Sequence, residues 1–268
     1  MIVESLHVHP LKSGRAIDLG RATVTPLGLA GDRELMVVDA HGRFLTQRGH
    51  PRLALVAATI AAGRVTLGAP ERRPITAPIV AGERAALRVE IWGEHVDAVV
   101  VDPALDAWMS AWLGVPAHVV RFADGFVRPA DPAWAAPGDV VGFADGFALL
   151  VTGTASLDAL NAELERPVTM SRFRPNLVVR TSEPWVEDTW RRIRVGAVEL
   201  ELVKPCGRCV MINVEQATGV AGREPLRTLT RSRTLEHRGK TRVVFGQNAV
   251  PRGVGDVHVG DPVVVLEA

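Results

Sequence analysis

The chain has 268 residues, enough for one large domain or two modest ones. Its 47% hydrophobic and 23% charged residues are typical of a soluble globular protein, and its formal net charge of +1 provides no overall attraction to nucleic acid or to an acidic membrane. The chain opens without a signal peptide, and its apolar runs are too short to cross a bilayer. We therefore expect a cytoplasmic protein with no nucleic-acid partner and no membrane partner.

Short valine-rich segments, separated by Gly, Pro and Asp, predict strands along the whole chain. In the first half the predicted strands are 2–8, 22–26, 35–39, 53–60, 65–67, 87–91 and 96–101. In the second half they are 149–151, 177–180, 192–195, 198–203, 210–214, 243–244 and 262–266. Many short strands at even spacing favour barrels over a parallel sheet covered by helices. The fold class we predict is mainly β with a few helices (α+β), arranged as two β-barrel-like domains.

Helices interrupt this pattern at three places. Asp102 is suited to cap a helix that has Pro103 at its first position and ends at Gly114, with apolar residues spaced along one face. A second helix is predicted to begin near Thr154 or Ser156 and to stop before residue 167, and a short third helix follows residue 225. Residues 123–142 hold three prolines and three glycines and predict a long functional or inter-domain connection. We place the domain boundary near residue 120, which divides the chain into domains 1–120 and 121–268.

Two cysteines three positions apart, Cys206 and Cys209, are the only cysteines of the chain. Thioredoxin-type dithiol exchange needs the first cysteine at a helix N-terminus, whereas the β-branched residues 210–214 predict a strand. A structural zinc site needs four ligands, and neither a second cysteine pair nor matching histidines occur. Two inert cysteines are disfavoured by the neighbouring cations Lys204 and Arg208. The pattern favours one thiolate as ligand to a metal that an organic cofactor carries, and dithiol exchange and inert thiols stay open as alternatives.

Several cationic motifs have the chemistry to hold such a cofactor. Lys12, Ser13 and Gly14 follow the first strand, where side-chain and backbone donors can cradle a phosphate. A turn with Asp32 and Arg33 opens a later strand, and residues 172–176 place two guanidinium groups and an amide just before another. Each motif alone is weak, because a single arginine before a strand is usually a solvated residue.

Taken in order, these motifs resemble those of the MOSC proteins, a family named after the C-terminal domain of molybdenum cofactor sulfurases. They are HPLKS at 9–13, GDR at 31–33, LTQR at 45–48 with PRL at 51–53, RFRPN at 172–176, KPCGRC at 204–209, FGQN at 245–248 and VGDPV at 259–263. The resemblance runs nearly end to end, with a MOSC N-terminal β-barrel domain followed by the MOSC domain. The chain is most similar to bacterial relatives of the mitochondrial amidoxime-reducing component.

The resemblance implies a molybdenum cofactor, in which a pterin dithiolene with a phosphate tail holds the metal and Cys209 completes its sulfur ligands. The other positions that match cofactor-binding residues of the family are Lys12, Ser13, Arg33, Arg174, Asn176, Gly207 and Asn248. Gly207 stands where many relatives have serine, so only its backbone N–H remains for that contact. Gln47 and Arg48 are further candidates to approach the cofactor, and Cys206 is expected to be a packing thiol on the same strand face as Lys204.

The resemblance further implies an oxidoreductase that reduces small N-hydroxylated compounds, such as amidoximes, by two-electron oxygen transfer at molybdenum. Two cysteines are too few for an iron–sulfur cluster. We therefore expect electrons from a separate ferredoxin-, flavin- or cytochrome-type protein. The alternative is a non-enzymatic molybdenum-cofactor carrier or sulfur-transfer module, in which Cys209 carries a persulfide or holds the cofactor transiently.

Overall fold

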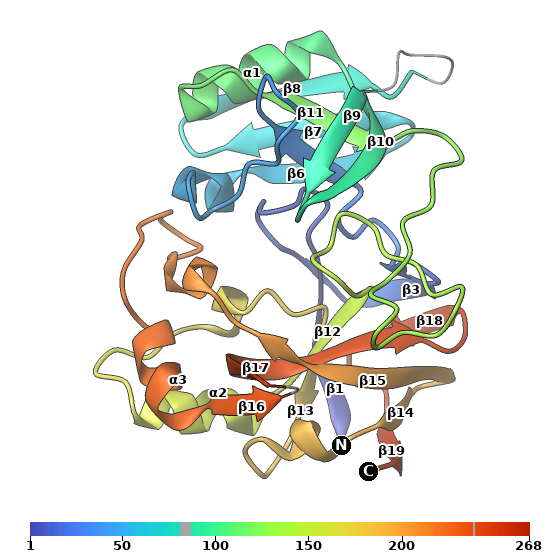
Figure 1. The fold of residues 1–268 in the computed structure, drawn as a ribbon, viewed down its shortest axis with the longest axis vertical. Helices are drawn as coiled ribbons and strands as arrows, with labels where there is room; N and C mark the ends of the chain where they lie inside the picture. Colours follow the sequence, from blue (N-terminus) through green and yellow to red (C-terminus); the bar gives the residue numbers. More distant parts are fainter. Residues whose placement is uncertain (81–86, 238) are drawn as a thin grey trace.

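The structure, a computed structural model, describes residues 1–80, 87–237 and 239–268. It has two lobes, which lie one above the other in Figure 1. The small lobe comprises the described residues between 35 and 122, and the large lobe comprises residues 1–29 and 149–268. Residues 123–148 run between the lobes as a mainly irregular segment, as predicted for 123–142. Within the described ranges, none of the helices has the length and apolar character needed to span a bilayer.

The small lobe contains two antiparallel sheets and one long helix. One sheet has the strand order β5 (Leu35–Val38), β11 (His118–Phe122), β10 (Glu94–Val100) and β9 (Leu87–Ile91), and the other has β6 (Ala57–Ala61), β7 (Arg64–Ala69) and β8 (Arg72–Pro78). The helix α1 (Pro103–Leu113) buries its apolar face in the core that both sheets share. Its predicted ends are confirmed: Asp102 accepts a hydrogen bond from the Ala104 amide at 2.8 Å, and Gly114 ends the helix at φ +74°.

The large lobe is built on one long mixed sheet. Its order is β19 (Val263–Glu267), β14 (Arg192–Val195), β15 (Val198–Gly207), β17 (Lys240–Pro251), β12 (Leu149–Gly153), β13 (Leu177–Arg180), β1 (Ile2–Val8) and β2 (Ile17–Leu19), and β16 (Thr234–His237) also pairs with β17. A smaller sheet joins β18 (Gly255–His258), β3 (Arg21–Thr25) and β4 (Gly28–Leu29). The fold is mainly β, as predicted, and β1 and β3 from the first 29 residues pair with β13 and β18 of the C-terminal half. The division at residue 120 stays a prediction.

Two further helices cover the large lobe. The helix α2 (Thr154–Ala162) begins at the predicted place, but Gly153 is its N-cap and Thr154 and Ser156 lie inside it. Ser156 instead donates a hydrogen bond to the buried carboxylate of Glu187 at 2.7 Å. The helix α3 (Leu226–Ser232) follows residue 225, as predicted. Together with η4 (Val210–Asn213) these helices enclose a satellite core around Phe173 and Phe245.

The predicted strand 53–60 is wrong in its first half. Residues Pro51–Leu55 form a 3₁₀ helix, η1, and β6 begins only at Ala57. Proline at the first position favours a helical turn, and the turn lets Leu53 and Ala54 both point into the core, which alternation along a strand does not allow.

The predicted strand 210–214 is also wrong. Residues Val210–Asn213 form the 3₁₀ turn η4, closed by the Ile212 amide on the Cys209 carbonyl at 3.2 Å. The turn buries Ile212 and leaves Val210 exposed. The strand that argued against dithiol exchange is therefore not formed. A single 3₁₀ turn is still not the α-helix N-terminus that thioredoxin-type chemistry uses.

Candidate functional site

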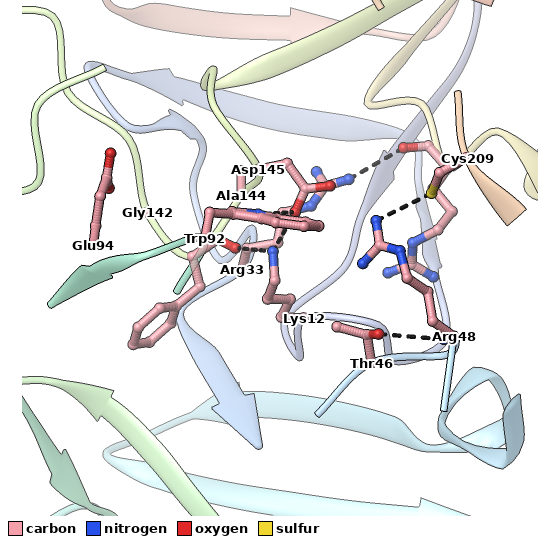
Figure 2. A network of polar contacts seen from close by, with 12 residues as sticks. Lys12, Arg33, Thr46, Arg48, Trp92, Glu94, Gly142, Ala144, Asp145 and Cys209 are labelled. Carbon is pink, nitrogen blue, oxygen red and sulfur yellow. Dashed lines mark hydrogen bonds and ion pairs between the residues drawn. The ribbon is translucent and has the colours of Figure 1, made fainter. Parts of the chain in front are cut away.

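A pocket opens where the two lobes meet, with an open space of about 800 Å³ including its mouth. All eight predicted site residues line this one pocket. They are Lys12, Ser13, Arg33, Arg174, Asn176, Gly207, Cys209 and Asn248. Figure 2 shows part of its polar network, with Lys12, Asp145 and Trp92 close together and Arg48 beside Cys209. The binding role of each residue stays a prediction.

Lys12 and Ser13 reach the pocket at the point where the chain leaves the large lobe. The Lys12 amide donates to the Leu35 carbonyl at 2.7 Å, and Ser13 has a φ of +64° in a turn closed by Gly14. The Lys12 ammonium donates to the Phe143 carbonyl at 2.8 Å and forms an ion pair with Asp145. Burial lowers the pKa of Lys12, although the carboxylate of Asp145 opposes this shift. The turn thus presents one buried ammonium and one buried hydroxyl.

Arg33 is held by a buried carboxylate beside it. Asp32 pairs with the Arg33 guanidinium and accepts the His9 amide at 2.7 Å. Burial raises the pKa of Asp32, but the Arg33 charge and the hydrogen bonding of His9 outweigh it and lower the pKa to about 2. The guanidinium also donates to Asn176 Oδ1 at 3.0 Å and to the Arg174 carbonyl at 3.2 Å. Asp32 therefore fixes the side chain that the sequence assigns to the cofactor.

Arg174 brings a second guanidinium to the same wall. It follows the 3₁₀ turn η2 (Met170–Arg172) with a φ of +56°, and its Nη1 donates to the Gly14 carbonyl at 2.6 Å. Burial and the nearby Arg33 charge lower the pKa of Arg174 to about 9. Two cations held this close favour an anionic ligand between them.

Asn176 and Asn248 have their side chains committed mainly to the protein. Asn176 accepts the Leu150 amide at 3.1 Å and donates to the His7 carbonyl at 3.2 Å, so it joins β12, β13 and β1. The Asn248 amide nitrogen lies 3.3 Å from the Lys204 carbonyl, across the β15–β17 pairing. Gly207 has room for a Cβ, which would meet Arg242 at an ordinary 3.5 Å.

The two thiols reach the same pocket from the end of β15. Cys209 Sγ accepts a hydrogen bond from Arg48 Nη2 at 3.1 Å, and Cys206 Sγ accepts one from Arg208 Nη1 at 2.8 Å. Cys206 is half-buried and lines the pocket wall, and its role as a packing thiol stays a prediction. Bulges in β15 between Leu202 and Lys204 and between Pro205 and Gly207 interrupt the regular alternation of the strand, but Lys204 and Cys206 still line one common cavity.

Sequence reasoning missed part of this site. Trp92 lies in a hairpin of the small lobe with no motif to signal it, and its indole donates to Asp145 at 3.2 Å. The Arg48 guanidinium lies 4.6 Å from the Trp92 ring centroid, which places it beside Cys209. Gln47, by contrast, is buried, and its side-chain amide donates hydrogen bonds to the Ser13 carbonyl at 2.9 Å and to Gln216 Oε1 at 3.0 Å. Of the two further candidates, Gln47 and Arg48, Arg48 is the one that contacts a cysteine of the thiol motif.

Unmatched buried donors test whether this pocket fits a polar cofactor. Among the described residues of its wall, four atoms are buried and lack a hydrogen-bond partner: Ser13 Oγ, Arg172 Nε, Arg174 Nη2 and Arg208 Nε. A buried polar group left without a partner costs about 1–3 kcal/mol. A phosphate and a pterin edge, which are rich in acceptors, would pair with such donors. The residues present therefore fit a phosphate-bearing heterocyclic cofactor beside Cys209.

Comparison with known proteins finds family matches over most of the chain. The MOSC N-terminal beta barrel domain matches residues 1–116, and the MOSC domain matches residues 138–264. The mitochondrial amidoxime-reducing component 1 of Danio rerio is 33% identical over 98% of this chain and 84% of its own length. The chain belongs to the MOSC family. The human mitochondrial amidoxime-reducing component 1 is 32% identical to this MOSC protein, over 98% of the chain and 82% of its own length.

A third relative is a much longer protein, and this chain matches only part of it. The molybdenum cofactor sulfurase of Danio rerio is 30% identical over 86% of this chain, but the match covers 30% of the sulfurase. The pocket of the MOSC protein takes residues from both matched segments. Lys12, Ser13 and Arg33 come from the first, whereas Arg174 and Cys209 come from the second. Neither segment alone holds the set.

Proposed function

We propose that this MOSC protein is a molybdenum-cofactor-dependent oxidoreductase that reduces N-hydroxylated compounds, with Cys209 as the protein ligand of the metal. One observation carries the proposal: the Cys209 thiol lines a pocket whose wall also holds buried donors without partners, Ser13 Oγ and Arg174 Nη2. Membership of the MOSC family and near full-length similarity to amidoxime-reducing components support the cofactor and the reaction class.

The reaction breaks one N–O bond. An amidoxime, R–C(NH₂)=N–OH, takes up two electrons and two protons and becomes the amidine R–C(NH₂)=NH and water. When bound, the cofactor supplies two-electron oxygen-transfer chemistry at its metal. The protein supplies binding and orientation, and this chain's two cysteines cannot build an iron–sulfur cluster of four thiolates. Our proposal therefore includes a separate ferredoxin-, flavin- or cytochrome-type protein as the electron source.

The residues of the pocket divide this work. Arg33 and Arg174 place positive charge where a phosphate or the polar pterin edge binds, and Ser13 adds a hydroxyl donor. Lys12 holds Asp145 at the mouth of the pocket. Arg48 donates to the Cys209 sulfur at 3.1 Å, which orients the thiolate and stabilises its negative charge.

Two matched cysteine variants test the assignment. The protein is produced in a host that makes the molybdenum cofactor, and molybdenum content and benzamidoxime reduction are measured with reduced methyl viologen as donor. We expect Cys209→Ala to lose turnover by more than 100-fold and most of its metal, while Cys206→Ala keeps both. Full metal content and full turnover in Cys209→Ala would defeat the assignment. Loss confined to Cys206→Ala would mean that the two thiols have the opposite roles.

The similarity to a molybdenum cofactor sulfurase supports a second candidate function, a cofactor carrier or sulfur-transfer module. In that case Cys209 would carry a persulfide or hold the cofactor transiently. Mass spectrometry of the intact protein separates the candidates. One additional sulfur atom on Cys209 without reductase turnover favours sulfur transfer, whereas stoichiometric molybdenum with turnover favours the reductase.

A further inference from the structure

A second cavity adjoins the first, with an open space of about 940 Å³ including its mouth. The two share a wall made of Asp145, Gly146, Phe147, Cys206, Gly207 and Asn248. Figure 2 shows Trp92 and Asp145 between Glu94, which lines the second cavity, and Cys209, which lines the first. A molecule in the second cavity would therefore face the cofactor pocket across this shared wall.

The outer wall of the second cavity is built from the irregular segment that the sequence marked as functional or inter-domain. Pro129, Asp131 and Pro132 line it. Arg128 holds this segment in place: its buried guanidinium donates to the Ala144 carbonyl at 2.7 Å, to the Gly142 carbonyl at 3.2 Å and to Glu94 at 2.9 Å. The outer wall is thus attached to the small lobe through Glu94 and to the chain segment that directly precedes Asp145 of the shared wall.

Two aromatic side chains line this cavity, Trp92 largely exposed and Phe147 mostly buried. Trp92 is 46% exposed, and its ring is fixed by an edge contact with Phe44 at 5.0 Å between centroids and by the Arg48 guanidinium at 4.6 Å. Phe147 lies on the shared wall, with the Lys204 ammonium 5.6 Å from its centroid. Rigid aromatic faces beside prolines favour a planar, aromatic ligand, which packs against them by offset stacking.

The charges around this cavity balance. Its lining contains the acids Glu94, Asp131 and Asp145 and the bases Arg128, Lys204 and Arg242. Glu94 pairs with Arg128, and Asp145 pairs with Lys12 behind the wall. A cavity with three acidic and three basic side chains in its lining provides no strong net attraction to an anionic or cationic molecule.

We infer that this second cavity is the substrate-binding chamber, and that it selects neutral, planar aryl compounds with the N-hydroxyl group directed past Asp145 to the shared wall. The inference rests on the proposed reductase function and adds to it the substrate class. An aryl ring would lie against Trp92 and Phe147, and the reacting N–O bond would reach the side of the wall on which Cys209 lies.

The test compares two substrates that share the reacting group, benzamidoxime and acetamidoxime. In the loaded protein, the ratio of kcat/KM for benzamidoxime to that for acetamidoxime is measured, because effects on the cofactor cancel in this ratio. We expect Trp92→Leu to lower the ratio about tenfold, as the loss of aromatic stacking predicts. Pro132→Trp, at an exposed loop position, is expected to lower it by narrowing the chamber.

Trp185→Leu is the matched control. Like Trp92, which has a φ of +55°, Trp185 has a positive φ, and the Arg233 guanidinium lies 4.1 Å from its ring centroid. Trp185 is not among the residues that line either cavity. Its ratio should equal that of the wild type. An unchanged ratio in both Trp92→Leu and Pro132→Trp, or an equal fall in the control, would overturn the inference.

A binding measurement separates the failure of this inference from the failure of the proposed function. Calorimetric titration of the purified full chain with benzamidoxime, in the absence of an electron donor, needs no turnover. We expect Trp92→Leu to weaken binding at least fivefold. If the loaded protein reduces neither amidoxime, the proposed function fails, and this titration still decides: weakened binding supports the chamber, whereas equal binding, or none in the wild type, overturns it.

Discussion

Arg48 and Cys209 stand 161 residues apart in the sequence, yet Arg48 Nη2 donates to Cys209 Sγ at 3.1 Å. The arginine comes from the small lobe and the thiol from the large lobe, so the contact joins the two lobes beside the pocket that Cys209 lines. Trp92 holds the guanidinium from its other side at 4.6 Å. The thiol is therefore positioned jointly by both lobes.

Arg48→Met tests this contact. Hydrogen bonds to charged groups contribute about 1.5–3 kcal/mol, so we expect turnover of benzamidoxime to fall at least about tenfold while molybdenum content is retained. Arg52→Met is the control, because Arg52 stacks on Trp112 at 4.0 Å in the same way but outside the pocket. Turnover equal to that of the control would mean that Arg48 contributes nothing through Cys209.

Ser13→Ala and Ser156→Ala are expected to act in opposite ways. Ser13 Oγ is buried and has no partner within the described part of the chain, so its removal should leave the unfolding free energy of the cofactor-free protein unchanged or raised by about 1 kcal/mol. Ser156 donates to Glu187 and accepts the Trp185 amide at 2.8 Å, so its removal should destabilise by about 1–3 kcal/mol.

The same pair distinguishes a ligand role from a structural one. Urea unfolding of the cofactor-free protein provides the stabilities, and molybdenum retained after dialysis measures cofactor affinity. Ser13→Ala should lose cofactor, and Ser156→Ala should not. Equal retention in both variants would remove Ser13 from the proposed cofactor site.

Asp32→Asn should make the free energy of unfolding less dependent on pH in the acidic range. The folded pKa of Asp32, about 2, lies below its ordinary value of 3.8, so the ionised carboxylate stabilises the fold above that ordinary value by about 2 kcal/mol. This contribution is lost as the pH falls through about 2. The wild type should therefore exceed the variant in stability at pH 7, and the difference should shrink between pH 4 and 2.

Urea unfolding at pH 7, 4 and 2.5 measures this dependence. Asp124→Asn is the comparison, because Asp124 forms an exposed ion pair with Arg121 that solvent screens. A stability difference for Asp32→Asn that stays constant from pH 7 to 2.5 would exclude the ion pair with Arg33 as its source.

Gly246→Ala should destabilise the strand that carries Asn248. Gly246 has a φ of +75°, and an added Cβ would lie 2.7 Å from Thr152 Cγ2 and 2.8 Å from the Val151 carbonyl oxygen. Overpacking and backbone strain together predict a loss of roughly 2–4 kcal/mol. Gly239→Ala has a similar φ of +69° but nothing within 4 Å, so it should lose only about 1 kcal/mol. Thermal unfolding compares the two, and equal losses would exclude the steric contact.

Local sequence chemistry predicted much of the fold. The capping of α1 by Asp102 and Gly114 acts within one turn, and β1, β13 and β14 have the predicted bounds because they are short, rich in β-branched residues and flanked by polar or turn residues. The predicted strands 53–60 and 210–214 were wrong because burial in the core, together with Pro51 in the first case, outweighed strand propensity. In each, residues with strand propensity turn into a 3₁₀ helix because core packing requires it.

The sequence by itself determined which side chains were available: a thiol pair with adjacent cations, and the motifs that resemble the MOSC family. Only the tertiary structure decided that Arg48 meets Cys209, that Asp145 lies in the wall between two cavities with Trp92 lining the second, and that β1 and β3 pair with strands of the C-terminal half. The physical reason is the distance along the chain over which each kind of interaction acts. Capping and alternation act between neighbours in the chain, whereas these contacts join residues whose separation along the chain leaves no periodic trace.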